Sequence, residues 1–200
     1  MVTEDLIQGF VFFAILEMAS VFSHVLVAFA LGQLQPWKAW PIRFWALSFL
    51  CSLLPDVEVL AFALGIPYEH LFGHRGLTHS LAFALVIGLV VVRVGFHSVS
   101  PGSWVWWSLM THFSLVTASH GVLDAMTDGG LGVAFFAPFE SRRYFLPWTP
   151  IKVSPIGISE FFTTYGADVL ASELIWVGIP VGVGLIAATL IRWQVTRNRG

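Results

Sequence analysis

The stretch that decides the fold is HRGLTHSL (residues 74–81), which leads without a break into the apolar run LAFALVIGLVVV (residues 81–92). Two histidines, an arginine and a threonine therefore lie at the entrance of a segment that prefers hydrocarbon to water. Polar side chains are costly in such a place unless they face partners or a wet cavity. The junction indicates a helix that begins at a polar site, and other parts of the chain have to supply the partners.

The composition of the 200-residue chain is typical of a membrane protein. Hydrophobic residues make up 56% and charged residues 11%, whereas a soluble domain carries roughly 25% charged residues. The net charge is -2 and no basic patch is interleaved with aromatics, so we expect no nucleic-acid partner. The single cysteine, Cys51, excludes a cysteine-ligated metal site and an intrachain disulfide. The acidic start, MVTEDLIQGF, is unlike a secretory signal, and we expect it to begin the mature chain.

Five stretches approach the roughly 20 apolar residues that a transmembrane helix needs. They cover about residues 6–31, 42–64, 81–96, 104–123 and 169–191. We therefore expect an all-α fold, a polytopic membrane helical bundle of about five transmembrane helices in one integral membrane domain (residues 1–200). Pro55 is expected to break or bend the second helix, and Pro180 to kink the last.

Residues 125–167 are too polar and too rich in proline to cross a bilayer. Arg142, Arg143 and Lys152 lie there among aromatic residues, and this mixture prefers the headgroup level. We expect a surface-lying segment of short helices and turns, which either guides a ligand or serves only as an anchor.

The basic residues of the loops favour an orientation with the N-terminus outside. Five spans would place six of them on one side (Lys38, Arg43, Arg93, Arg192, Arg197 and Arg199) and four on the other (Arg75, Arg142, Arg143 and Lys152). Positively charged loops remain in the cytoplasm, so the side with four is expected to be extracytoplasmic.

That extracytoplasmic side also collects the ionisable residues of three helix ends, LPDVE (54–58), HRGLTHS (74–80) and HGVLD (120–124). His120 and Asp124 are four residues apart, share a helix face and can hold one metal ion, although the spacing also fits an interhelical hydrogen-bonding pair. Asp56 and Glu58 can both point inward from an irregular turn after Pro55, or can cap a helix end.

Within HRGLTHS, Gly76 marks a turn and Thr78 is the expected N-cap of the next helix. His74 then lies in the loop and His79 in the first helical turn, so both can face a shared site. Arg75 between them is a candidate clamp for a phosphate or a carboxylate.

Two further histidines lie within expected spans. His24 is either a ligand or a structural hydrogen-bonding group. His112 lies two turns before the HGVLD motif, about 12 Å away by helical rise, and is expected to be structural.

The motifs SHVLVAFALG (23–32), LLPDVE (53–58), HRGLTHSL (74–81), SHGVLDAMTDGG (119–130) and APF (137–139) resemble, in this order, those of the bacterial LexA-binding, inner membrane-associated, metal-dependent hydrolases. That family usually has Pro-Asp-x-Asp in the second motif, where this chain has Glu58. The resemblance implies a multi-span α-helical protein of the bacterial inner membrane with a metal site, hydrolytic activity and a regulatory protein as a partner.

Residues and resemblance together indicate a divalent metal site of one to three ions, with zinc preferred and manganese or iron as alternatives. The ligand types are also loosely similar to those of zinc-dependent phospholipase C. The expected metal ligands are Asp56, His79, His120 and Asp124, followed by His24 and His74. The expected catalytic residues are Glu58, as a bridging ligand or general base, and Arg75, and the expected substrate-binding residues are Arg142 and Arg143.

These expectations support a metal-dependent hydrolase of a phosphoester, in a membrane lipid or a lipid-linked substrate. The alternative from another class is a metal-binding membrane protein without catalysis, such as a transporter, a sensor or a regulatory partner. An amide hydrolase is a third interpretation, although no HExxH motif is present.

Overall fold

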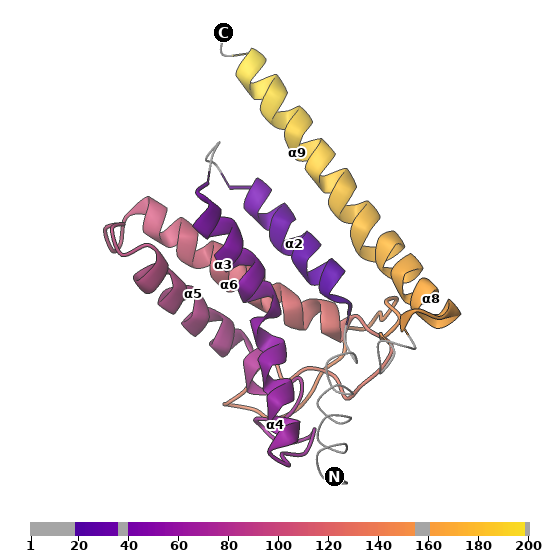
Figure 1. The fold of residues 1–200 in the computed structure, drawn as a ribbon. Helices are drawn as coiled ribbons and strands as arrows, with labels where there is room; N and C mark the ends of the chain where they lie inside the picture. Colours follow the sequence, from indigo (N-terminus) through magenta and orange to yellow (C-terminus); the bar gives the residue numbers. More distant parts are fainter. Residues whose placement is uncertain (1–18, 36–39, 155–160, 199–200) are drawn as a thin grey trace.

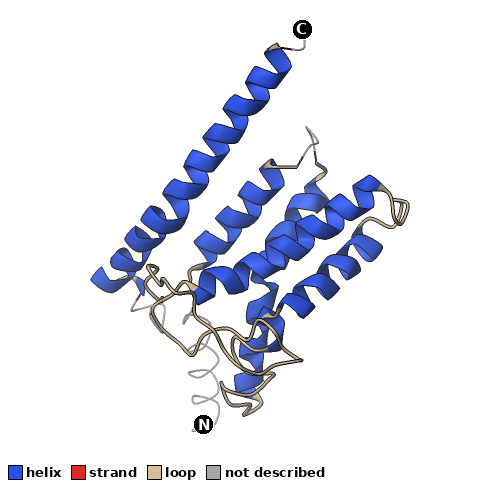
Figure 2. Cartoon of the chain, turned by 180° about the vertical axis from the view of Figure 1, so that it is seen from behind, coloured by secondary structure: helices blue, strands red, loops and turns tan. Residues whose placement is uncertain are grey.

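The computed structural model describes residues 19–35, 40–154 and 161–198. All regular elements within these residues are helical (Figure 2), and the only β-type pairing there is two isolated bridges in the loop after α6. The predicted all-α fold class is therefore confirmed.

Four helices form a central bundle in which α5 packs along α6, while α2 packs against both α3 and α6 (Figure 1). They are α2 (Val21–Gln33), α3 (Ile42–Leu53), α5 (Leu81–Gly95) and α6 (Trp104–Ala125). The close approach of α5 to α6 depends on Gly88, since a Cβ there would lie 2.1 Å from Ser114 Oγ. Around this contact Phe44, Leu109 and Phe113 form an apolar core.

The longest helix of the described residues lies outside the bundle and extends beyond it (Figure 1). It consists of α8 (Thr164–Glu173), a π-helical turn η3 (Leu174–Gly178) and α9 (Ile179–Arg197). Pro180 lies in the first turn of α9, after the π-helical turn, and the kink expected at this proline stays a prediction. No residue of α9 is buried by the protein.

One helix among the described residues is long and apolar enough to cross a membrane, the 34-residue unit Thr164–Arg197. Helices α2 and α5 are apolar but have 13 and 15 residues, about 20 and 22 Å by helical rise. A bilayer core is about 30 Å thick. The five-span topology stays a prediction, and half of the first expected span, residues 6–18, lies outside the described residues.

The second expected span is divided, because α3 ends at Leu53. Pro55 then lies in the first turn of a 3₁₀ helix, η1 (Leu54–Val59), followed by the short α4 (Leu60–Ala63). The predicted break at Pro55 is present, and because of it Asp56 and Glu58 lie in a 3₁₀ helix instead of an α-helix.

The N-cap predicted for α5 was wrong. Ser80 caps α5 by accepting a hydrogen bond from Phe83 N, and Thr78 lies in a preceding 3₁₀ turn, η2 (Leu77–His79). The Thr78 hydroxyl instead donates to Pro55 O at 2.9 Å and to Glu58. Thr78 therefore links η2 to η1 and does not cap α5.

Residues 126–154 form turns, and the two bridges pair Thr127 with Ile151 and Val133 with Tyr144. Short helices were expected in this segment, but none is found in residues 126–154. Phe139 and Trp148 are 90% and 56% exposed, and the location of the segment at the membrane surface stays a prediction.

Candidate metal centre

Three elements meet at one end of the bundle and bring four of the expected ligands together. Asp56 comes from η1, His79 from η2, and His120 and Asp124 from the last turns of α6. One ligand atom of each residue lies within 4.8 Å of all the others. The side chains of His79, His120 and Asp124 are fully buried, whereas that of Asp56 is 17% exposed.

The local sequence explains why these elements can meet. The break at Pro55 directs the chain of η1 across the end of α6, and a glycine on α6 admits η2. A Cβ at Gly121 would lie 2.9 Å from the carbonyl oxygen of His79. A side chain at position 121 would therefore push His79 away from the neighbouring His120.

The protonation state of His120 follows from its contacts. His120 Nδ1 lies 2.7 Å from the carbonyl oxygen of Ser52, and a carbonyl only accepts, so Nδ1 carries a proton. In a neutral imidazole, Nε2 then presents a lone pair. That lone pair faces Asp56 Oδ1 at 2.9 Å and Asp124 Oδ2 at 3.5 Å. Neither His120 Nε2 nor Asp56 Oδ1 has a hydrogen-bond partner among the described residues.

The spacing of the four ligand atoms fits a metal ion. His79 Nε2 lies 3.1 Å from Asp124 Oδ2 and 3.7 Å from Asp56 Oδ1. With the two His120 distances, four separations span 2.9–3.7 Å. Tetrahedral zinc with bonds of about 2.0–2.1 Å separates its ligand atoms by about 3.3 Å. The donor set of two imidazoles and two carboxylates also suits manganese or iron.

Glu58 lies behind His79 and not among the four converging atoms. Its Oε1 is 3.0 Å from His79 Nδ1, which assigns the proton to Nδ1 and directs the Nε2 lone pair toward the cluster. The same carboxylate accepts hydrogen bonds from Arg75 N and the Thr78 hydroxyl. A carboxylate that orients a ligand histidine in this way is a recurrent feature of metal sites.

Arg75 is fully buried, with a positive φ of 57°. Its Nε is 3.5 Å from Asp124 Oδ2, while its other nitrogens donate to Gly129 O at 2.9 Å and Thr127 Oγ1 at 3.1 Å. Gly130 is needed here, because a Cβ on it would lie 2.7 Å from the Arg75 guanidinium. The structure thus places Arg75 as the counter-charge of Asp124; its expected contact with a substrate anion stays a prediction.

With neutral histidines, the charges of the cluster balance only when a cation is bound. Asp56, Glu58, Asp124 and Arg75 together leave two negative charges when the histidines are neutral. Uncompensated charge is costly in a buried site. One divalent ion would cancel it, which agrees with the spacing of the ligand atoms.

His24 and His74, the two further residues expected as ligands, lie next to the cluster but are not among its four converging residues. The His24 ring stacks on that of His120, with centroids 3.8 Å apart, and its Nε2 is 3.7 Å from Asp124 Oδ1. Neither His24 nitrogen has a hydrogen-bond partner among the described residues. His74 Nδ1 lies 3.5 Å from Glu58 Oε1, on the far side of His79.

The two expected substrate-binding arginines have different environments. Arg143 donates to the carbonyl oxygens of His74 at 2.7 Å and Tyr68 at 2.8 Å, so it fastens the loop that carries His74. Burial lowers the pKa of Arg143, although a guanidinium keeps its charge in proteins. Arg142 is exposed, with Nε 3.8 Å from Glu140.

Sequence reasoning missed the backbone groups that complete the site. Besides the Ser52 carbonyl, the Ala19 N–H donates to Asp124 Oδ1 at 3.4 Å. Backbone groups have no sequence signal, so only the fold reveals them. Thr127, three residues after Asp124, donates to the Asp124 carbonyl at 2.7 Å, and this spacing could have been noticed.

Comparison with known proteins places the chain among inner membrane proteins. A family model described as "YdjM inner membrane protein" matches residues 18–196, which include all the residues of the cluster. The "Inner membrane protein YbcI" of Escherichia coli (strain K12) is 38% identical over 177 residues, covering 88% of this chain and 99% of that protein. No solved structure matches the chain significantly.

Proposed function

The chain belongs to the YdjM inner membrane protein family, and we propose that it is a membrane-embedded, metal-dependent hydrolase of a phosphoester in a lipid or lipid-linked substrate. The proposal depends on one observation above all. One ligand atom each of Asp56, His79, His120 and Asp124 converges on a common point, and four of their separations, 2.9–3.7 Å, are those of atoms around a metal ion.

The chemistry divides between the ion and the protein. A divalent ion supplies Lewis acidity toward a phosphoryl oxygen and lowers the pKa of a water toward neutrality. Glu58 and the Ser52 carbonyl keep the lone pairs of His79 and His120 directed at the ion. Asp56 is the one ligand with an exposed part, so its carboxylate is best placed to meet a substrate or to accept a proton from water. For Glu58, whose oxygens contact Arg75 N, Thr78 and His79, we propose the orienting role over that of general base.

An apolar groove beside the site supports a lipid substrate. Its volume is about 360 Å³, within the roughly 300–1,000 Å³ of small-molecule sites. Leu60 and Phe83 are among its apolar lining residues, and its polar lining residues are Glu58 and Thr78. Because Glu58 contacts His79, a hydrocarbon chain in this groove would lie next to the metal cluster. The exposed Arg142 is then the better candidate to attract a headgroup phosphate, since Arg143 is held by backbone carbonyls.

A second candidate is a metal-binding protein without catalysis. Asp56, His79, His120 and Asp124 would supply four protein ligands to an ion, and three of them are fully buried. Closed four-ligand shells are typical of structural zinc, whereas catalytic sites keep an open position. Catalysis would need access of water or substrate to the ion, and Asp56, the one of the four that is partly exposed, is where this access would lie.

The two candidates are separated by measuring metal and turnover on the same preparation. Purified protein in detergent micelles is analysed for bound metal and incubated with a panel of phospholipids, with products followed by mass spectrometry. We expect about one divalent ion per chain and release of a phosphorylated headgroup or of phosphate, both lost in Asp124→Asn. Bound metal without any turnover would favour the non-catalytic candidate, and absence of metal from both proteins would refute the proposed function.

A further inference from the structure

We propose that Glu173 is a positioning residue of the metal centre, acting through the N-terminus of α2. This inference rests on the proposed metal site. Glu173 is the last residue of α8, and its exposed fraction is 4% although the helix continues into the unburied α9. A buried carboxylate is costly in hydrocarbon, so its position within the one described helix that is long and apolar enough to cross a membrane calls for an explanation.

The carboxylate of Glu173 binds both donors of one residue. The backbone N–H and the hydroxyl of Ser20 donate to its two oxygens. Ser20 is the N-cap of α2, yet its own side chain accepts no capping hydrogen bond, because the hydroxyl is directed at Glu173. The negative charge also lies at the positive end of the α2 dipole, where it is stabilising.

The residues on either side of Ser20 contact the metal cluster. Ala19, the preceding residue, donates its N–H to Asp124 Oδ1. His24, one turn further along α2, stacks on His120 with an interplanar angle of 10°. Holding Ser20 in place therefore holds the Ala19 amide against Asp124 and the His24 ring against His120.

The helix packing around this contact is tight. Val177, in the π-helical turn directly after Glu173, belongs to a small apolar core with Ala19, Leu123 and Ile151. Single π-helical turns within α-helices are frequent at functional positions. The turn η3 thus contacts α2 where it begins, next to the cluster.

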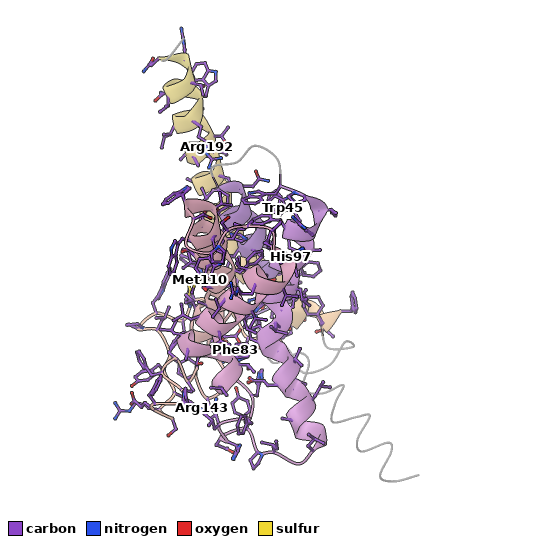
Figure 3. All side chains as sticks on the ribbon, turned by 90° about the vertical axis from the view of Figure 1, so that its left-hand side faces the viewer. Trp45, Phe83, His97, Met110, Arg143 and Arg192 are labelled. Carbon is purple, nitrogen blue, oxygen red and sulfur yellow. The ribbon has the colours of Figure 1, made fainter. Side chains whose placement is uncertain are left out.

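The opposite end of α2 provides a matched control. Arg192 of α9 donates to the carbonyl oxygens of Gln33 and Leu34 at 2.8 Å each, where a positive charge suits the C-terminal end of the dipole. Figure 3 shows Arg192 far from Arg143, which fastens the loop beside the cluster. Arg192 and Glu173 therefore both fasten the long helix to α2, but only Glu173 does so beside the ligands.

The test compares Glu173→Gln with Arg192→Gln in the full chain in micelles. A glutamine keeps the size of the side chain and can accept only one of the two Ser20 hydrogen bonds through its oxygen. We expect the affinity for Co²⁺ to fall about tenfold, the lower limit for residues that orient ligands, and the visible absorption bands of bound Co²⁺ to shift. Arg192→Gln should change neither, and Glu173→Asp should partly restore both.

A second readout needs no metal. In protein labelled with ¹⁵N-histidine, the imidazole shifts of His24 and His120 should move in Glu173→Gln and remain in place in Arg192→Gln. Unchanged shifts in Glu173→Gln, or equal changes in both variants, would refute the positioning role. Wild-type protein that binds no Co²⁺ would instead refute the proposed function, and the histidine shifts would still decide the role of Glu173.

Discussion

Two buried histidines on the same helix show how differently two regions of this molecule use one residue type. His112 and His120 lie two turns apart on α6, about 12 Å by helical rise, and their exposed fractions are 1% and 0%. His112 stacks on Phe44 at 4.5 Å in the apolar core, and its Nε2 lies 2.8 Å from Ser48 Oγ. His120 faces two carboxylates.

The difference lies in the neighbours, since the two imidazoles are equally buried. One neutral hydroxyl satisfies an imidazole nitrogen and leaves no net charge. Around His120, the carboxylates of Asp56 and Asp124 add negative charge that Arg75 only partly offsets. The first region needs no cation, whereas the second has a group of residues that could hold one. Each prediction below pairs a change at the metal cluster with a matched change in the apolar core or at a neutral position.

The largest effect is expected from Asp124→Asn, which removes a charge that lies within 3.5 Å of the Nε2 atoms of both His79 and His120. Metal affinity should fall by more than about 100-fold, beyond the range for residues that only orient ligands. Titration calorimetry with Zn²⁺ measures it, and circular dichroism checks that the variant remains helical. Asp168→Asn is the neutral control, because Asp168 pairs on the surface with Lys152. Equal zinc affinity in wild type and Asp124→Asn would remove the distinction between the two regions.

The histidine pair sharpens the comparison directly. His120→Gln should reduce the bound metal to background, because a ligand with a fixed lone pair is lost. His112→Gln should leave metal binding unchanged. It should lower the free energy of unfolding by about 1–3 kcal/mol, because the buried hydrogen bond between Ser48 and the imidazole is lost. Elemental analysis and thermal unfolding in detergent distinguish the outcomes. A loss of metal in both variants would contradict a local role for His120.

The glycine pair tests the packing on which each region depends. Gly121→Ala places a Cβ 2.9 Å from the His79 carbonyl, and Gly88→Ala places one 2.1 Å from Ser114 Oγ. Both variants should be destabilised by about 1–3 kcal/mol through overpacking. Only Gly121→Ala should also weaken metal binding, by about tenfold, because it moves His79 relative to His120. Equal metal affinities in the two variants would show that the cluster tolerates movement of η2.

The sequence allowed the cluster to be predicted for a physical reason. Carboxylates and imidazoles are rare in apolar helices, so Asp56, His79, His120 and Asp124 stood out as polar residues at the ends of otherwise apolar stretches. The all-α class followed from the apolar runs in the same way.

The partners of these ligands could not be predicted, because their roles depend on geometry. A carbonyl such as that of Ser52 looks like any other in the sequence, and the side chain of Arg75 turns inward only because a positive φ and Gly130 allow it. The contact between Glu173 and Ser20 joins residues 153 positions apart, beyond the reach of any local pattern. The second expected span, residues 42–64, is longer than α3, because the apolar run continues past Leu53, where this helix ends.

The smallest effect is expected from a pair of hydroxyl groups, Thr78 and Ser48. Thr78 donates to Glu58 and to the Pro55 carbonyl, and Glu58 in turn holds the proton of His79 Nδ1. Thr78→Val keeps the shape and removes the hydroxyl, so metal affinity should fall by less than about tenfold, because Thr78 acts on a ligand only through Glu58.

Ser48→Ala removes the matching hydroxyl from His112 and should cost about 1 kcal/mol of stability with no change in metal affinity. Thermal unfolding and zinc titration of both variants give the two quantities, and Thr78→Ser, which keeps the hydroxyl, should behave as wild type. A fall in affinity in Ser48→Ala equal to that in Thr78→Val would mean that the apolar core and the metal centre are coupled along α6. Among the described residues, Ser48 forms hydrogen bonds with Phe44 and His112 in the apolar core, so we expect the two regions to respond independently.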